Sequence, residues 1–557
     1  MARQFPIIAL IACLASVVVA PLYFVVLNGF QTAAADGTLH WSLQAWNDAW
    51  SQPGIRNAIA NTAKRVLITE AIALPAAVLV TWLLAKYYVP GRRIIDLFMW
   101  IAFFLPSIPV VLGWILLLDP QFGLINVAVR NLIGIKEGLL DIYSFWGIVF
   151  AHLTTRAIAA KYIFLLPAFR NLNGLLEEAA EMCGANRWQV IRTIVLPVML
   201  PAIAVAAVVS IVFSIESFEI ELVLGPPTNF YVYSTKIYQL IREDPPQFQI
   251  ASILSIAILL VMLPLFAAQR ALTVRGGAET LGSHFRSEYR VLHTLRWPLF
   301  AFLFALTVVT TVVPLGAMIV GAFMNAFGFF DLTNTFTIAH WSRVLNDPLF
   351  LGAAWNTIML GAGAALLGTF ISALVAYVSV RTRHSLRGLA DLLSWLPAGI
   401  PGVILGLGML WMFLAVPIFR PAYGTVAILV IATTLANLTI GVQLIKSNML
   451  QLGHEMEEAS AVSGARWSQT FLRIVVPILE QAFITAGILI FAAATRNVSN
   501  VALLSTGNNR PLALLQVDYM ADGLYESASI VGIFLVLLSV GVALGARSIA
   551  GRIGMRV

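Results

Sequence analysis

Residues 177–197 read EEAAEMCGANRWQVIRTIVLP, and residues 457–477 read EEASAVSGARWSQTFLRIVVP. Both stretches are polar, and each lies between long apolar runs. Three landmarks recur at a single offset of 280 positions, namely Glu178 with Glu458, Gly184 with Gly464, and Pro197 with Pro477. Three matches at one offset are hard to produce by chance, so the chain is predicted to contain two copies of one unit.

The composition indicates a membrane protein. Of the 557 residues, 60% are hydrophobic and 11% are charged, whereas soluble domains carry roughly a quarter charged residues. The first apolar run, at residues 6–29, is longer than the about 7–15 residues of a signal-peptide core, so we expect it to be retained as a membrane helix. Cys13 and Cys183 are far apart and differ in setting, so we expect neither a disulfide nor a metal site.

We predict an all-α polytopic membrane protein, because apolar runs of about 20 residues, enough to cross a bilayer, recur along the whole chain. About 12 transmembrane helices are expected, near residues 6–29, 60–86, 94–118, 144–167, 196–223, 249–270, 297–324, 356–380, 389–416, 424–445, 477–503 and 528–547.

The basic residues predict the orientation of these spans. With the N-terminus in the cytoplasm, 21 of the 34 Lys and Arg residues fall on the cytoplasmic side and 8 on the other side. Short basic loops resist translocation, so this bias sets the topology. It also explains the net charge of +7 without a nucleic-acid partner. Both termini and both polar stretches are therefore expected in the cytoplasm.

Each copy is predicted to hold six helices, and because six is even, both copies have the same orientation. Parallel repeats imply a pseudo-twofold axis along the membrane normal, with the functional pathway on that axis. The first six-helix repeat is predicted over residues 1–272 and the second over 297–557, joined by a polar cytoplasmic linker at 273–296.

Two further landmarks fit a duplication at other offsets. Asn-Thr opens the second span of each repeat, at Asn61 and at Asn356, 295 positions apart. LPSIP at 105–109 is matched with LPAGIP at 396–401, at an offset near 291. The second repeat must then have lost residues before its polar stretch, and its short external loop at 415–424 explains most of the loss. The prolines of these motifs are expected to kink the third span of each repeat.

The polar stretches are predicted to be short helices that leave the membrane. Glu and Ala favour helix formation, Gly184 permits a turn that other residues resist, and Pro197 suits the first turn of the membrane helix that follows. For one copy alone, a solvated loop at the headgroups is an equally good interpretation. Two copies at equivalent positions favour two docking surfaces.

The two stretches resemble the E-A-A-x3-G-x9-I-x-L-P motif of ABC-importer permeases. The motif is complete in the first stretch, and the second has Ser for Ala and Val for Leu. The matching residues are Glu178, Ala179, Ala180, Gly184, Ile194, Leu196, Pro197, Glu458, Ala459, Ser460, Gly464, Ile474, Val476 and Pro477. In that family the motif forms a coupling helix that sits in a groove of a cytoplasmic ATPase subunit. The fused two-repeat form most resembles type I permeases for ferric iron.

The resemblance implies a permease subunit of a binding-protein-dependent ABC importer in a bacterial inner (plasma) membrane, forming the pathway for ferric iron. Its expected partners, apart from membrane lipid, are two cytoplasmic ATPase subunits and a periplasmic substrate-binding protein. The chain contains no G-x-x-x-x-G-K-[ST] phosphate loop. We therefore expect no enzyme and no bound cofactor or metal here, with ATP used by the partner subunits.

Two alternatives to ferric import stay open. The same machine would import a small organic solute such as thiamine, a polyamine or 2-aminoethylphosphonate. Ferric permeases carry a sequence that resembles R-E-L-S in the eleventh span, whereas residues 496–499 read RNVS and lack the acidic residue. A secondary transporter is the alternative from another class, but it would not need duplicated docking helices.

Charged residues inside spans are candidates for the pathway, because burying them in a membrane is costly. Glu216 and Glu219 end the fifth span, and Arg496 ends the eleventh. Glu216 and Arg496 are 280 positions apart and so are equivalent in the two repeats. About 28 Å of helix after Pro197 places Glu216 near the external face. The two residues are predicted either to pair across an external gate or to belong to a polar rim at the headgroups.

Other charges in the spans suggest simpler roles. Lys64 and Arg65 lie near the external end of their span, where long side chains can snorkel to the headgroups. Arg156 and Lys161 lie deeper. Glu70 is predicted to pair with one of these four basic residues.

Overall fold

The computed structural model describes residues 5–33, 39–134, 138–172, 174–276, 294–330, 332–382 and 384–552. Most of the predicted linker, residues 277–293, lies outside the described residues.

In its described residues the first repeat contains helices and one antiparallel hairpin, in which Gln31 pairs with Trp41. Its elements are α1 (Phe5–Phe30), β1 (Gln31–Ala33), β2 (Leu39–Trp41), α2 (Gln44–Ser51), α3 (Pro53–Lys86), α4 (Arg92–Phe104), α5 (Ser107–Leu118), α6 (Leu124–Ile133), α7 (Phe145–His152), η1 (Leu153–Ala157), α8 (Ile158–Arg170), α9 (Gly174–Met182), α10 (Arg187–Val190), η2 (Ile191–Val195), α11 (Leu196–Ile215), α12 (Glu219–Leu224), η3 (Pro226–Thr228), α13 (Tyr233–Arg242) and α14 (Phe248–Gly276).

The second repeat follows the same order of helices. Its elements are α15 (Arg296–Thr307), η4 (Val308–Val312), α16 (Val313–Phe323), α17 (Ala339–Leu345), α18 (Pro348–Arg381), α19 (Arg387–Trp395), η5 (Leu396–Gly399), α20 (Gly402–Ala415), η6 (Arg420–Ala422), α21 (Val426–Met449), α22 (Glu455–Val462), α23 (Trp467–Thr470), η7 (Phe471–Val475), α24 (Val476–Ile478), α25 (Glu480–Arg496), α26 (Leu512–Ala521) and α27 (Tyr525–Arg552).

The predicted number of membrane spans is confirmed. Within the described ranges, 9 helices are long and apolar enough to cross a membrane, and three bent helix pairs bring the number to 12. Each of these spans overlaps one of the predicted apolar ranges. The sequence prediction differs from the structure mainly at span ends and at the bends.

The third span of each repeat is broken rather than kinked. The two halves meet at 104° in α4–α5 and at 112° in α19–α20. The breaks fall at Pro106 and Pro401, each of which directly precedes the new helix. Proline lacks an N–H and keeps the residue before it out of helical geometry, so a helix ends there.

The structure corrects the predicted alignment of the two proline motifs. α3 and α18 are both 34 residues long and start 295 positions apart. The same offset relates Ser107 to Gly402, the first residues of α5 and α20. Pro106 therefore matches Pro401, and the offset of 291 was wrong because the LP of LPAGIP belongs to an extra 3-10 turn, η5.

Two structural differences account for the later change in offset. The loop between the third and fourth spans is shorter in the second repeat, so the N-caps Ser144 and Thr425 are 281 positions apart. The π-helical turn η1 then adds one residue to the fourth span of the first repeat. The offset becomes 280 from there through the polar stretches.

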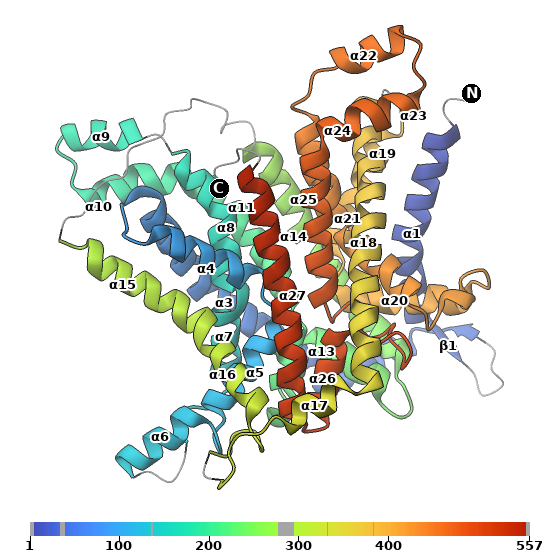
Figure 1. Ribbon diagram of the computed structural model, residues 1–557. Coiled ribbons are helices and arrows are strands. Elements are labelled where there is room, and N and C mark those ends of the chain that lie inside the picture. The colour runs from blue at the N-terminus through green and yellow to red at the C-terminus, as the bar shows by residue number, and fades with distance from the viewer. Residues whose placement is uncertain are drawn as a thin grey trace.

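The first helix of each repeat packs against the other repeat. α1 lies along α20 and α19, while α16 lies along α5, and α15 reaches α4 (Figure 1). One continuous hydrophobic core includes residues of both repeats. Because the first helix of each repeat crosses to the other repeat, the broken third spans α4–α5 and α19–α20 lie close to the boundary between the repeats.

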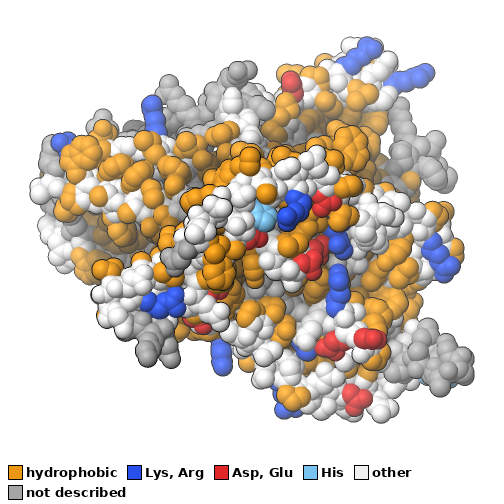
Figure 2. Space-filling model, turned by 60° about the horizontal axis from the view of Figure 1, so that its bottom comes forward, with side chains coloured by type: hydrophobic (Ala, Val, Ile, Leu, Met, Phe, Trp, Pro, Cys, Tyr) orange, Lys and Arg blue, Asp and Glu red, His pale blue; other side chains and the backbone are white. Residues whose placement is uncertain are grey.

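The molecule has two distinct ends. Figure 1 shows α9 and α22 at one end and β1, α6 and α17 at the other. We call these ends the polar-stretch side and the hairpin side. Seen toward the hairpin side, acidic and basic side chains lie close together in the middle of the face, with hydrophobic side chains around them (Figure 2).

Candidate functional site

The turn in each polar stretch requires its glycine. α9 and α22 are followed by Gly184 and Gly464, whose φ angles are +87° and +80°. The N–H of Ala185 donates to the Ala180 carbonyl at 3.0 Å, the bond that closes a Schellman helix end. A Cβ on either glycine would meet nothing within 4 Å. The glycines are therefore needed for the positive φ rather than for close packing within the chain, which confirms the predicted special turn.

The second short helix of each stretch begins in the same way in both repeats. The N–H groups of Asn186 and Arg466 donate to the side-chain oxygens of Gln189 and Gln469, at 2.7 and 2.8 Å. π-helical turns η2 and η7 follow, and the predicted prolines occupy the second position of α11 and of α24. The two stretches thus share one backbone course from the glycine to the proline. Beyond it α11 continues unbroken, whereas α24 ends at Ile478 and the membrane helix α25 follows after a bend of 77°.

An ion pair ties each polar stretch to the long second span of its repeat. Lys86, the last residue of α3, contacts Glu177 at 2.9 Å, and its Nζ donates to the Leu172 carbonyl at 3.1 Å. In the second repeat Arg381, the last residue of α18, contacts Glu457 at 2.9 Å. Its Nη2 also donates to the Leu452 carbonyl, at 3.1 Å.

These anchors were missed in the sequence, where the second glutamate of each pair was singled out. The signal was available, because both stretches begin with Glu-Glu and both long spans end in a basic residue, at Lys86 and Arg381, 295 positions apart. The first glutamate, Glu177 or Glu457, faces the body of the protein, and the second is exposed. One glutamate therefore fixes the helix while the other is presented outward.

The outer face of each stretch is open. Met182 is 88% exposed and Val462 is 90% exposed, at equivalent positions in α9 and α22. Of the motif residues, the exposed ones are Glu178, Ala179, Gly184, Leu196, Pro197, Glu458, Ala459, Gly464 and Pro477. The half-buried ones are Ala180, Ile194, Ser460, Ile474 and Val476.

The Asn-Thr landmarks hold the short helix that follows the fifth span. The Asn61 amide donates to the Tyr231 carbonyl at 3.1 Å, and the Thr62 hydroxyl accepts from the Tyr233 N–H at 2.9 Å, at the start of α13. In the second repeat Asn356 donates to two carbonyls, at 3.1 and 3.2 Å, and Thr357 accepts at 2.8 Å at the start of α26. The matched bonds show that the duplication extends to tertiary contacts.

Glu216 and Arg496 occupy equivalent helix ends but do not form an ion pair with each other in this structure. A Glu216 carboxylate oxygen accepts from the Gly402 N–H at 3.1 Å. Arg496 donates to the Phe103 carbonyl at 2.8 Å, and its guanidinium lies 5.7 Å from the centroid of the Phe103 ring. Each candidate therefore binds the backbone of the opposite repeat.

The structure shows at which level of the fold Glu216 lies. Its partner Gly402 is the first residue after the break in the third span, so Glu216 lies at the level of that break. The chain continues through α12 and α13 before it returns in α14. Glu216 is therefore followed by two further helices before the chain returns, and α11 is unbroken up to it, as the helix length counted from Pro197 assumed.

Several of the other charges in the first repeat are paired in the interior. Arg65 and Glu221 are both 0% exposed and contact at 2.9 Å, and His152 contacts the same Glu221 oxygen at 2.9 Å. Lys161 contacts Glu70 at 3.1 Å. The pairing of Glu70 with one of the four basic residues is thus confirmed. The snorkelling predicted for Arg65 was wrong, because Glu221 comes to it from α12.

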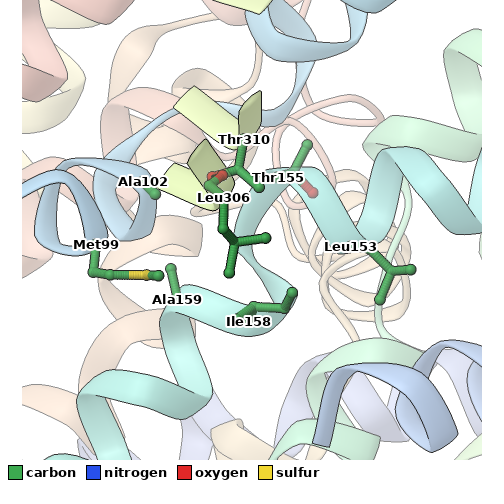
Figure 3. Close-up of a pocket in the computed structure, with 8 residues that line it drawn as sticks. All are labelled: Met99, Ala102, Leu153, Thr155, Ile158, Ala159, Leu306 and Thr310. Carbon is green, nitrogen blue, oxygen red and sulfur yellow. The ribbon is translucent and has the colours of Figure 1, made fainter. Parts of the chain in front are cut away.

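A small cavity lies at the seam between the repeats, between α4, η1–α8 and α15–η4 (Figure 3). Its walls include Met99 from α4 and Leu306 from α15, with the hydroxyls of Thr155 and Thr310 as polar groups. No charged side chain lines this cavity. Among the described residues, no group of three or more His, Cys, Asp or Glu could hold a metal ion.

Comparisons with known proteins agree with this geometry. Residues 73–275 match the family described as binding-protein-dependent transport system inner membrane component. The sn-glycerol-3-phosphate transport system permease protein UgpA of Brucella abortus is 31% identical over 206 residues, covering 32% of this chain and 67% of that protein. The probable ABC transporter permease protein y4fN of Sinorhizobium fredii is 24% identical over 506 residues, covering 87% and 85%.

A ferric relative matches over a longer region than UgpA. The ferric transport system permease protein FbpB of Actinobacillus pleuropneumoniae is 26% identical over 445 residues, which is 79% of this chain. The match spans 63% of that relative, less than two-thirds of its length.

Proposed function

Because the chain belongs to the family of binding-protein-dependent inner membrane transport components, we propose that it is the permease of an ABC importer and forms its translocation pathway. The proposed orientation has the polar-stretch side, and with it both termini, in the cytoplasm of a bacterial cell. The excess of Lys and Arg on that side supports this orientation.

The observation that carries the proposal is the pair of matched polar stretches. Each presents an exposed helix face, and each is fixed to a long span by an ion pair, Lys86–Glu177 or Arg381–Glu457. A helix held at its base can transmit a displacement to the span behind it. Two such helices offer docking surfaces for two ATPase subunits, which would bind and hydrolyse the ATP.

The proposed stoichiometry follows from the duplication. One chain supplies both six-helix repeats, so the complex is expected to contain one copy of this chain and two ATPase subunits. Mass measurement of the complex purified in detergent tests this. Two copies of the permease chain per complex would contradict it.

The cargo that we propose is ferric iron, delivered by a periplasmic binding protein to the hairpin side. The long match to a permease named for ferric transport supports this cargo. The mixed acidic and basic surface in the middle of that face (Figure 2) would suit a polar protein partner. Uptake of radioactive ferric iron by cells that do and do not express the chain with its partner subunits tests the cargo. Equal uptake would exclude ferric iron.

A small organic solute is the second candidate cargo. The observation that favours it is the identity of residue 497. Ferric permeases have a sequence here that resembles R-E-L-S, whose second residue is acidic, whereas this chain has Asn497. Asn497 accepts hydrogen bonds from Ser499 and from the Asn500 N–H, at 2.9 and 3.2 Å, so it serves the local turn after α25. Competition by thiamine, a polyamine or 2-aminoethylphosphonate in the same uptake assay distinguishes the candidates.

A further inference from the structure

The breaks in the third spans place helix ends inside the protein. α4 ends at Phe104, and α20 begins at Gly402. The first N–H groups of a helix and its last carbonyls have no partner within the helix. Within a membrane span these groups must find partners elsewhere in the protein.

Charged residues from the opposite repeat bind these two helix ends. Glu216 caps α11 in the first repeat and accepts from Gly402, the first residue of α20 in the second. Arg496 is the last residue of α25 in the second repeat and donates to Phe103, in the last turn of α4 in the first. The contacts therefore cross the boundary between the repeats in both directions.

The sign of each charge fits the helix end that it meets. A helix N-terminus carries partial positive charge and a C-terminus partial negative charge. The carboxylate of Glu216 meets the N-terminus of α20, and the guanidinium of Arg496 meets the C-terminus of α4. This explains why two equivalent positions carry opposite charges without touching one another.

Two neighbouring features support the same contact. Glu219 accepts from the Val498 N–H at 3.2 Å, a third bond from a charged side chain to the backbone of the other repeat. A Cβ at Gly402 would lie 1.9 Å from the Asn500 side-chain oxygen. Glycine at 402 therefore lets the start of α20 pack beside the segment that follows Arg496.

We propose that Glu216 and Arg496 are positioning residues that hold the pathway shut through a crossed clasp, defined as Glu216 on Gly402 together with Arg496 on Phe103. This rests on the proposed function, because the clasp joins the two repeats whose separation would open the pathway. When the pathway opens, Glu216 and Arg496 lose their hydrogen-bond partners. The start of α20 and the end of α4 lose theirs in the same movement. The clasp thus favours the closed state, and cargo delivery and ATP binding supply the free energy needed to open it.

The test measures access to a thiol placed near the clasp. Val501 is 0% exposed and follows shortly after Val498, so Val501→Cys introduces a small apolar thiol there. The parent chain carries Cys13→Ser and Cys183→Ser, which removes the two exposed native thiols. The purified chain in detergent is treated with a water-soluble maleimide, and the labelling rate is measured.

Glu216→Ala and Arg496→Ala are each expected to raise this rate roughly tenfold, because losing a hydrogen bond to a charged group shifts an equilibrium by about that factor. Glu216→Gln and Arg496→Lys keep an acceptor and a donor, so they should restore much of the protection. The swap of Glu216→Arg with Arg496→Glu should protect no better than the alanine variants, since each charge would then meet the wrong helix end.

Two controls separate the clasp from general loosening. Val442→Cys places a thiol at another fully buried site, in α21, and its labelling should not change in the clasp variants. Glu526→Ala removes a carboxylate that accepts from the Phe327 N–H at 2.6 Å within the second repeat, and it should leave the thiol of Val501→Cys protected.

Three results would overturn the proposal. These are unchanged labelling in both alanine variants, a charge swap that restores the parent rate, and a rise of equal size at Val442→Cys. The second would mean that the two charges act on each other. Because labelling needs no ATPase subunit and no cargo, failure of the clasp can be told apart from failure of the proposed import function.

Discussion

The interiors of the two repeats are held together by different means, although their membrane spans follow the same order. In the first repeat α3, α8 and α12 are joined by Arg65–Glu221 and Lys161–Glu70. In the second repeat the positions equivalent to Arg65, Glu70, His152 and Lys161 are taken by residues with no charge, namely Leu360, Ala365, Thr433 and Gly441.

Close packing replaces the ion pairs in the second repeat. A Cβ at Gly441 would lie 2.3 Å from the Ser372 hydroxyl, and one at Gly361 would lie 2.7 Å from the Phe491 ring. Small residues let membrane helices approach closely and gain dispersion energy along their length. Charges in the same setting are costly unless they are paired. The same arrangement of spans is therefore stabilised by ion pairs in one repeat and by close packing in the other. We expect substitutions to destabilise the two repeats by different mechanisms.

The largest effect is expected from leaving a buried charge alone. Glu221→Ala removes the carboxylate that serves both Arg65 and His152. Unfolding in detergent should become easier by about 3–5 kcal/mol, because the remaining charge has no compensation. Combining Glu221→Ala with Arg65→Leu, which copies Leu360 of the second repeat, should recover part of the loss. If the double variant were no more stable than Glu221→Ala, the ion pair would not explain the difference between the repeats.

Overfilling the second repeat should have a smaller effect. Gly441→Ala forces a methyl group against Ser372 and should destabilise the protein by about 1–3 kcal/mol, the usual range for overpacking. Gly352→Ala is the matched control. Gly352 lies in α18 of the same repeat, and a Cβ there would meet nothing within 4 Å. The control should be neutral or slightly stabilising, since glycine inside a helix costs about 0.5–1 kcal/mol. Equal melting temperatures for the two variants would contradict the close-packing account.

The polar stretches should respond alike in both repeats, in contrast to the interiors. Gly184→Ala and Gly464→Ala each place a side chain at positive φ, at a cost of roughly 1–2 kcal/mol. Uptake should fall by a similar factor in each variant, and by more in the double variant, with membrane insertion unchanged. Normal uptake and ATP hydrolysis in the double variant would contradict the proposed coupling role of these turns.

The smallest expected difference is the one between the two Asn-Thr landmarks. Asn61→Ala removes one hydrogen bond and Asn356→Ala removes two. At about 0.5–1.5 kcal/mol for each bond, Asn356→Ala should lower the melting temperature more than Asn61→Ala. The opposite order would show that the two anchors are not equivalent in strength.

Local sequence predicted the parts of the site that depend on the backbone of one segment. The glycine turns, the helix-starting prolines and the equivalence of Glu216 with Arg496 were all visible in it. The interaction partners of the charged side chains were not visible in the sequence, except that Glu70 was expected to pair with a basic residue. Arg65 meets a carboxylate from α12, and Arg496 meets a carbonyl 393 positions away. The direction in which those side chains point depends on helix rotation and on the angle of each break.

The sequence by itself determined the membrane class, the duplication and the two outward-facing polar stretches, because hydrophobic run length, repeat offset and turn chemistry are local properties. The tertiary structure decided which glutamate of each pair, Glu177 or Glu178 in the first stretch, faces inward. It also decided that Glu216 and Arg496 bind opposite helix ends rather than one another. The reason is geometric, because a broken span exposes helix ends at positions that become defined only when both repeats are packed together.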